Sequence, residues 1–91
     1  MVNRILFVCD TYKQARHKFN ECIRSLNTNQ NIRVDSANMT VELDTYSYEF
    51  IGLGSGLLNK VLGKEYNKIV ISELATEEQV ALLKSRERIG R

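Results

Sequence analysis

The sequence predicts an α/β fold, a single small sandwich of helices on a mixed sheet, with the element order β-α-β-β-β-α-β-α. Two short, unbroken apolar runs at 5–9 and 69–71 are typical of strands covered on both faces, as in a parallel sheet. Segments with helical spacing of apolar residues follow both runs. At 91 residues, the chain is long enough for one domain, 1–91, with one sheet and two or three helices.

The first apolar run leads directly into a helix. A strand at 4–9 is followed by Thr11 as the N-cap and Gln14 three residues later, which is the spacing of a capping box. Apolar residues then recur at intervals of three and four and predict one buried stripe: Tyr12, Ala15, Phe19, Cys22, Ile23 and Leu26. The polar residues at 27–31 are poor helix formers and predict the helix end.

The middle of the chain alternates apolar and polar residues. This period predicts a short strand at 32–35 and an antiparallel hairpin of 39–43 with 46–53. Leucine and valine at helical spacing predict a short helix from about residue 55 to Gly63. We expect 4–9 and the second apolar strand, 68–72, to form the parallel centre, with the hairpin on one side.

The last segment is predicted to be a helix from about residue 77 to 88, capped by Thr76 and Gln79. Its glutamates come first and its basic residues last, in the order that complements the helix dipole. The sequence also predicts a core that contains Ile5, Phe7, Phe19, Ile23, Val70 and Ile71.

The composition indicates a cytoplasmic protein with no membrane segment. No apolar stretch approaches the roughly 20 residues that span a bilayer, and the apolar run at the N-terminus is too short for a signal peptide. Cys9 and Cys22 are expected to be buried, reduced thiols. A net charge of +2 is too small to indicate nucleic-acid binding by itself.

Two stretches approach nucleotide-binding motifs and depart from them at the functional positions. In the glycine-rich stretch from Gly52, Lys60 is not preceded by glycine, and Val61 stands where a Walker A loop has Ser or Thr. The run 69–73 has the shape of a Walker B strand, but Ser72 replaces the metal-binding Asp and only Glu73 remains. We therefore expect no catalytic residue and no cofactor in either stretch.

Cys9 is the one candidate nucleophile. The run from Arg4 to Cys9 resembles the opening of low-molecular-weight tyrosine phosphatases and of phosphotransferase-system IIB-type proteins. Those phosphatases need an arginine six residues after the cysteine, but that position is Ala15 and Arg16 is one residue late. Asp10 would also disfavour the thiolate. His17, the single histidine, has no metal-ligand cluster around it in the sequence, so we expect no metal site.

Taken together, residues 4–73 resemble the ATPase core of phage terminase large subunits and related helicases. The strand 5–9 followed by Thr11-Tyr-Lys-Gln-Ala15 is similar to their strand and TYxQA-like turn, and 39–53 is similar to their hairpin. The run 62–73 looks like their approach to Walker B. The Walker A strand and loop would precede residue 1. The resemblance thus implies a degenerate RecA-like core, P-loop-NTPase-like without the P-loop, of viral or mobile-element origin.

These observations favour a small non-catalytic protein that binds a macromolecular partner, either a host or a viral protein, in the host-cell cytoplasm if viral. A nucleic-acid-associated module, an accessory in DNA packaging or processing, is the alternative, with DNA or RNA as the partner. A Cys9-dependent phosphate-handling enzyme is a third hypothesis. The candidate partner-binding residues are the basic side chains of the first helix and the C-terminus: Lys13, Arg16, His17, Lys18, Arg24, Lys84, Arg86, Arg88 and Arg91.

Overall fold

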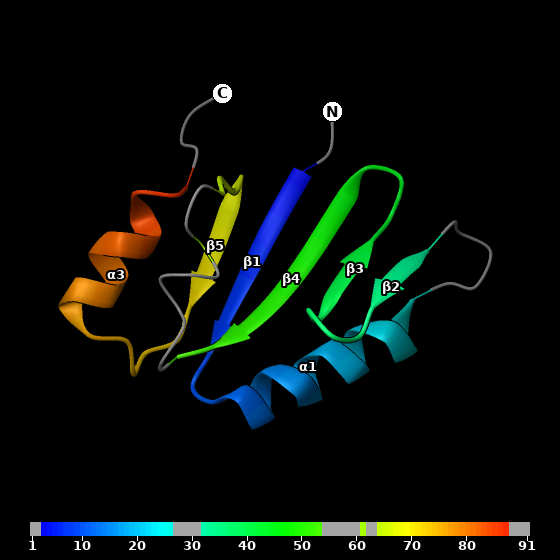
Figure 1. The fold of residues 1–91 in the computed structure, drawn as a ribbon, viewed down its shortest axis with the longest axis horizontal. Coiled ribbons are helices and arrows are strands. Elements are labelled where there is room, and N and C mark those ends of the chain that lie inside the picture. Colours follow the sequence, from blue (N-terminus) through cyan, green and yellow to red (C-terminus); the bar gives the residue numbers. More distant parts are fainter. Residues whose placement is uncertain (1–2, 27–31, 54–60, 62–63, 88–91) are drawn as a thin grey trace.

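A five-stranded mixed sheet with the strand order β2-β3-β4-β1-β5 forms the centre of the computed structural model, which describes residues 3–26, 32–53, 61 and 64–87 (Figure 1). The strands are β1 (Asn3–Cys9), β2 (Arg33–Asp35), β3 (Thr40–Glu42), β4 (Tyr46–Gly52) and β5 (Lys68–Ile71). The helices are α1 (Tyr12–Ser25) and α3 (Glu77–Lys84). The predicted α/β fold and mixed sheet are confirmed. The helix expected at 55–63 lies outside the described residues, apart from Val61.

The central strand is β1, which pairs in parallel with β4 on one side and with β5 on the other. Its residue Phe7 lies opposite Phe50 of β4 and Val70 of β5. The predicted hairpin is confirmed, because β3 pairs antiparallel with β4. β2 extends the sheet antiparallel to β3. The two apolar strands are neighbours as expected, but β5 is an edge strand.

Both helices begin at the predicted threonine caps. The Oγ1 of Thr11 accepts a hydrogen bond from the backbone N–H of Gln14 at 3.1 Å. At α3 the capping box is complete: the N–H of Gln79 donates to Thr76 Oγ1 at 3.2 Å, and the N–H of Thr76 donates to Gln79 Oε1 at 2.9 Å. These bonds satisfy backbone donors that the first helical turn leaves free.

Apolar residues pack on both faces of the sheet. Beneath α1 lie Cys9, Met39, Val41 and Phe50, which contact Ala15 and Phe19 of the helix. On the opposite face, Leu6, Val8, Ile51 and Ile69 pack with Val61, Tyr66 and Leu83 of α3. Described residues that follow β4, including Val61, Tyr66 and Leu83, therefore cover part of the face opposite α1.

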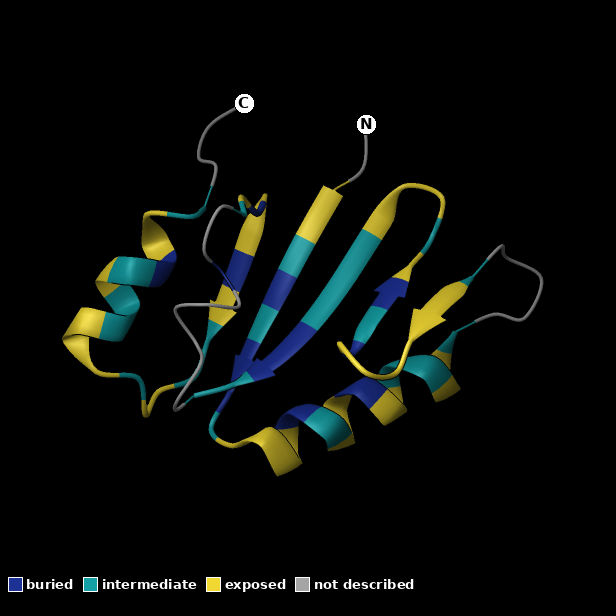
Figure 2. Ribbon diagram, in the orientation of Figure 1, coloured by how far each residue is buried: buried dark blue, intermediate teal, exposed yellow. Residues whose placement is uncertain are grey.

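The expectation that Val70 is buried is wrong. Phe19 is 1% exposed, and Ile5, Phe7, Ile23 and Ile71 are half-buried, but Val70 is 41% exposed. α1 packs mainly on β4 and to a smaller extent on β1. It runs from the end of β1 towards β2 and away from β5 (Figures 1 and 2). Among the described residues, elements therefore cover the apolar run of β5 on one face only.

Gly52, at the end of β4, allows the turn after β1 to approach closely. A Cβ atom on Gly52 would lie 2.4 Å from the backbone N of Tyr12 and 2.5 Å from the carbonyl carbon of Thr11. These are backbone atoms that cannot rotate away, so only glycine fits between β4 and the start of α1.

We predict that Phe19→Ala lowers the free energy of unfolding by about 3–5 kcal/mol, because it leaves a cavity between α1 and Phe50. Urea denaturation measures the decrease. Val70→Ala is the control, and we expect it to change stability by within about 0.5 kcal/mol because the side chain is largely exposed. A decrease below about 1 kcal/mol for Phe19→Ala would contradict the packing of α1.

We predict that Gly52→Ala lowers the free energy of unfolding by about 1–3 kcal/mol, since the added methyl forces β4 and the α1 N-terminus apart. Thermal and urea unfolding provide the measurement. Ser47→Ala, on the same strand, should stay within about 0.5 kcal/mol of the wild type. Equal stability of the two variants would mean that the close approach at Gly52 is absent in solution.

Candidate functional site

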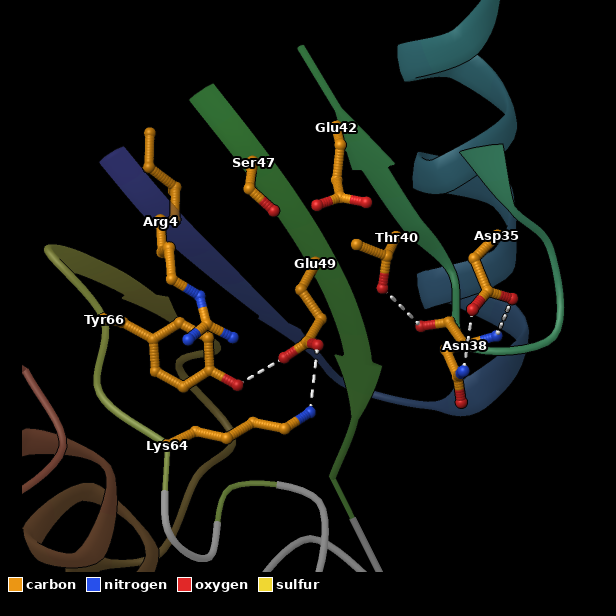
Figure 3. Close-up of a pocket in the computed structure, with 10 residues that line it drawn as sticks. Arg4, Asp35, Asn38, Thr40, Glu42, Ser47, Glu49, Lys64 and Tyr66 are labelled. Atoms are coloured by element: carbon orange, nitrogen blue, oxygen red, sulfur yellow. Dashed lines mark hydrogen bonds and ion pairs between the residues drawn. The ribbon is translucent and has the colours of Figure 1, made fainter. Parts of the chain in front are cut away.

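Polar side chains gather in a hollow of about 420 Å³ on the face of the sheet opposite α1 (Figure 3). Strand alternation positions them, because Ser47 and Glu49 point to the face opposite Tyr48 and Phe50. The lining residues come from β1, β3, β4, the β2–β3 turn and the segment before β5: Arg4, Ile5, Asp35, Asn38, Thr40, Glu42, Ser47, Glu49, Lys64 and Tyr66. The hollow therefore presents charges of both signs on the face of the sheet opposite α1.

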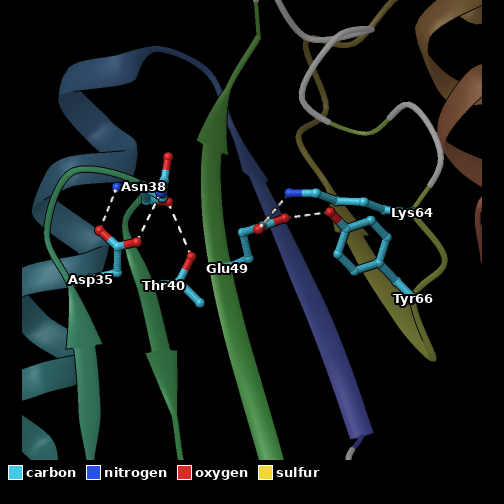
Figure 4. Close-up of polar contacts among 6 residues, drawn as sticks. All are labelled: Asp35, Asn38, Thr40, Glu49, Lys64 and Tyr66. Atoms are coloured by element: carbon cyan, nitrogen blue, oxygen red, sulfur yellow. Dashed lines mark hydrogen bonds and ion pairs between the residues drawn. The ribbon is translucent and has the colours of Figure 1, made fainter.

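At one end of the hollow, Glu49 connects two residues of the segment before β5 (Figure 4). Its Oε1 accepts a hydrogen bond from the hydroxyl of Tyr66, and its Oε2 forms a 3.3 Å ion pair with Lys64 Nζ. The Glu49 side chain is 13% exposed and Tyr66 is 1% exposed. Burial, and then the hydrogen bond to Glu49, raise the pKa of Tyr66 well above its usual range. The phenol is therefore neutral near pH 7 and donates to the carboxylate.

Arg4 of β1 holds the same segment from the other side. Its guanidinium lies over the Tyr66 ring, 5.3 Å from the centroid, which is a cation–π arrangement. Its backbone N–H donates to Asn67 Oδ1 at 2.8 Å, and its carbonyl accepts from the Asn67 N–H at 2.8 Å. These contacts fix the wall of the hollow to the central strand.

The turn between β2 and β3 forms the other end of the hollow. Asp35 accepts hydrogen bonds from the backbone N–H of Asn38 at 3.2 Å and from its Nδ2 at 2.8 Å. These bonds lower the pKa of Asp35, so its carboxylate is charged. Met39 then takes a left-handed conformation, with φ 51°, and buries its side chain under α1.

A second, smaller hollow of 190 Å³ lies at the carboxyl ends of β1 and β5. After β1 the chain turns to the face that carries α1, and after β5 it turns to the opposite face. In open α/β sheets, ligand crevices form where neighbouring strands lead to opposite faces in this way. Ser72 Oγ donates a hydrogen bond to Asp10 Oδ1 there. Cys9 lies beside this pair, and burial raises its pKa; Lys18 lowers it and Asp10 raises it. The thiol is thus a poor nucleophile at neutral pH.

The predicted basic residues do not form one surface. On α1, Lys13, Lys18 and Arg24 are exposed. Arg16 is bound within the protein: Nη1 donates to the Ser36 carbonyl at 2.9 Å and Nη2 to the Tyr12 hydroxyl at 2.6 Å. His17 lies 3.6 Å from Glu21, Nε2 to Oε1.

Of the C-terminal basic residues, Lys84 and Arg86 are described, and they lie with α3 on the opposite face. Lys84 is exposed. Arg86 is half-buried, and its carbonyl accepts the N–H of Tyr66 at 2.8 Å. Arg88 and Arg91 fall outside the described residues. The sheet therefore separates the described basic residues of α1 from those that follow α3.

Sequence reasoning missed the residues of the larger hollow. Alternation in 46–53 placed Glu49 on one face of a strand, and this was the one signal that pointed to it. Its partners Lys64 and Tyr66 follow 15 and 17 residues later, and no local pattern joins them to Glu49.

No protein-family model matches the chain, and no curated protein or solved structure is significantly similar to it. Within the described ranges, no three His, Cys, Asp or Glu side chains are grouped so that they could hold a metal ion. Neither helix in this part of the chain is long and apolar enough to cross a membrane.

We predict that the wild type becomes less stable above about pH 10 partly through Tyr66. An unfolded tyrosine ionises near pH 10, whereas folding raises the pKa of Tyr66, so the unfolded state releases its proton first and unfolding becomes easier as pH rises. This contribution is complete below about pH 10 and disappears above it. Tyr66→Phe should therefore show a smaller decline in urea stability between about pH 8 and about pH 11.

The matched control is Tyr46→Phe, because Tyr46 is 41% exposed on β4. The urea stability of Tyr46→Phe should decline with pH as that of the wild type does. At about pH 8, Tyr66→Phe should cost roughly 1–3 kcal/mol, since it removes the hydrogen-bond donor of Glu49. Parallel pH profiles for Tyr66→Phe and the wild type would contradict the predicted role of Tyr66.

Proposed function

We propose that this protein is a non-catalytic binding module whose macromolecular partner, a protein, contacts the polar hollow beside Glu49, on the face of the sheet opposite α1. The observation that carries the proposal is the convergence of side chains from β1, β3, β4 and the segment before β5 on that face. Glu49, Tyr66 and Lys64 hold one end rigid, while Thr40, Glu42 and Ser47 line the floor. Fixed groups of both signs suit a polar protein surface, because electrostatic complementarity gives register and specificity.

Two further observations support binding rather than catalysis. The raised pKa of Cys9 opposes its use as a nucleophile. Ser72, which stands where a Walker B strand has its aspartate, donates a hydrogen bond from its hydroxyl to Asp10. Both cysteines are free thiols, which favours a reducing compartment, and we place the protein in the cytoplasm on that ground.

The finer likeness to terminase and helicase ATPase cores is part of the same proposal. Its support is the adjacency of β1 and β5, the two strands that carry the TYxQA-like turn and the Walker-B-like run. In this proposal the chain keeps the sheet of a P-loop-NTPase-like core, serves a virus or mobile element, and acts by contact.

The alternative is a nucleic-acid-associated module, and the exposure of Lys13, Lys18 and Arg24 on α1 favours it. Basic side chains along one helix can contact phosphates, and such contacts make the affinity salt-dependent. The internal bonds of Arg16 and the contact of His17 with Glu21 reduce this surface below the five residues that the sequence indicated.

We predict that Ser47→Arg, which places a long side chain on the floor of the hollow, abolishes partner capture. The measurement is affinity capture from cells of the organism that encodes the chain, with quantitative mass spectrometry. The matched control is Lys13→Ala on α1, across the sheet from the hollow. One protein should be retained by the wild type and by the control but not by Ser47→Arg, whose thermal melt should be unchanged.

Identical capture by Ser47→Arg and the wild type would overturn the proposed binding face. A different outcome is capture of nucleic acid by the wild type. If Ser47→Arg keeps this capture and the double variant Lys13→Ala/Arg24→Ala weakens it, the nucleic-acid-associated module replaces the proposed protein-binding module. In that case a titration at two salt concentrations should show a slope that flattens by about one unit for each phosphate that the variant no longer binds.

A further inference from the structure

The face of the sheet that carries α1 is only partly covered. Every second side chain of β1 and β4 points to that face. Val70 of β5 continues the row, because it lies opposite Phe7 of β1. Beyond the edge of α1, these strands present what we call the uncovered strip: Ile5, Phe7, Tyr46, Tyr48 and Val70. Tyr46 and Val70 are each 41% exposed, and the other three are half-buried.

Aromatic contacts make the strip continuous with the core. Phe7 stacks on the buried Phe50, with centroids 5.0 Å apart, and lies 6.2 Å from the ring of Tyr48. Tyr48 in turn stacks on Tyr46, with ring centroids 6.1 Å apart and an interplanar angle of 2°. The row thus runs from a residue that is 3% exposed to one that is 41% exposed, so the strip is a rigid surface.

The sequence of β5 is that of a strand with two covered faces, yet Val70 on the α1 side is 41% exposed. Ile69 packs with Leu6 and Leu83 on the face opposite α1, while Val70 points to the α1 side. Val61, Tyr66 and Leu83 of α3, which also follow β4, pack on the former face. Among the described residues, no element covers Val70.

The shape of the strip matches one helix. β1 and β5 are neighbouring strands, and a helix of about 10 Å diameter covers roughly two strands spaced about 4.8 Å apart. The seven residues of β1 span roughly 23 Å, the length of about 15 helical residues. A helix laid there would lie beside α1 against its flank, where Gln14 and Lys18 already line the small hollow with Phe7 and Val70.

Addition of a strand is disfavoured, because the outer edge of β5 is occupied. The N–H of Ile69 donates to Glu87 Oε2 at 2.8 Å, and the N–H of Tyr66 donates to the Arg86 carbonyl at 2.8 Å. Tyr66 and Glu87 also form a parallel bridge. The segment after α3 therefore occupies the outer edge at Ile69 of β5 and at Tyr66 just before it, where a pairing strand would have to bind.

Two lysines flank the strip. Lys18 lies on the α1 side, and Lys68, opposite Ile5, lies on the β5 side; neither has an ion-pair partner among the described residues. Asp10 also lines the small hollow beside Lys18, and its carboxylate accepts a hydrogen bond from Ser72. An occupant with carboxylates on both sides of an apolar stripe complements this pattern.

We infer that the uncovered strip docks one amphipathic helix of a partner protein, with its apolar stripe on Phe7, Tyr48 and Val70 and its carboxylates at Lys18 and Lys68. The inference rests on the proposed binding function, and it names a second surface and the form of the partner there. The polar hollow is on the opposite face, so Ser47→Arg leaves the strip intact, and each surface is tested by itself.

The probe is a displayed library of helical peptides of about 15 residues, with a fixed apolar stripe and randomised flanking positions, selected on the wild-type protein. We expect the selected peptides to be enriched in Asp and Glu at the flanks. Val70→Asp should weaken their binding by about tenfold or more, since it places a charge at the centre of the apolar contact. The matched control is Val34→Asp, because Val34 is also a strand valine that is 41% exposed, but lies on β2 at the other edge of the sheet.

The double variant Lys18→Glu and Lys68→Glu tests the charges without touching the apolar floor, and it serves if Val70→Asp does not fold. It should reject the selected peptides and accept versions whose acidic flanks are replaced by Lys. Selection of no binders, flanks without acidic enrichment, or equal binding to Val70→Asp and Val34→Asp would overturn the inference. So would a dimer in analytical ultracentrifugation, or an oligonucleotide complex, that Val70→Asp abolishes, because the occupant would then be a second copy or a nucleic acid.

Discussion

The structure depends on β1 having a parallel neighbour on each side. Parallel strands cannot be joined by a tight turn, so each pairing needs a connection that crosses a face of the sheet. The first connection runs through α1, β2 and β3 before it reaches β4, and the second passes to β5. Leu6 and Val8 point to one face and Phe7 and Cys9 to the other, so β1 contributes to both apolar layers. Gly52 brings the end of β4 against the first turn of α1, which closes the first of these connections.

The two connections cover the faces unequally, and this inequality produces the surfaces that are open for binding. α1 covers β3 and β4 but leaves Val70 and Tyr46 in contact with solvent. On the other face, the segment around Tyr66 and α3 packs on β1 and β5, and polar side chains of β3 and β4 line the hollow beside it. The apolar strip and the polar hollow thus have the same origin: each lies where the cover of its face ends.

Polar groups close the boundary between covered and open sheet. Glu49 is almost buried, and a buried carboxylate is costly unless it is paired and hydrogen-bonded. Tyr66 and Lys64 supply these partners, and the Arg4 guanidinium lies over the Tyr66 ring. Arg16 acts similarly on the other face, where it ties the β2–β3 turn to α1 through the Ser36 carbonyl. Some charged residues in this chain therefore hold the connecting segments against the sheet and the helix, in addition to those that face solvent.

The sequence by itself determined the local elements. Apolar runs, alternation and threonine caps predicted β1, the β3–β4 hairpin, β5 and both described helices, because these signals act between residues a few positions apart. Only the tertiary structure decided how the faces are covered and which side chains meet. The continuous run Ile69–Ile71 is equally compatible with a strand covered on both faces or on one face. A strand's own pattern carries no information about where distant helices dock. Likewise, Glu49 meets Tyr66 and Lys64 because the chain returns across the sheet, and Arg16 was expected to face a partner but turns inward to Ser36. Hydrogen bonds between groups far apart in the chain follow from that path.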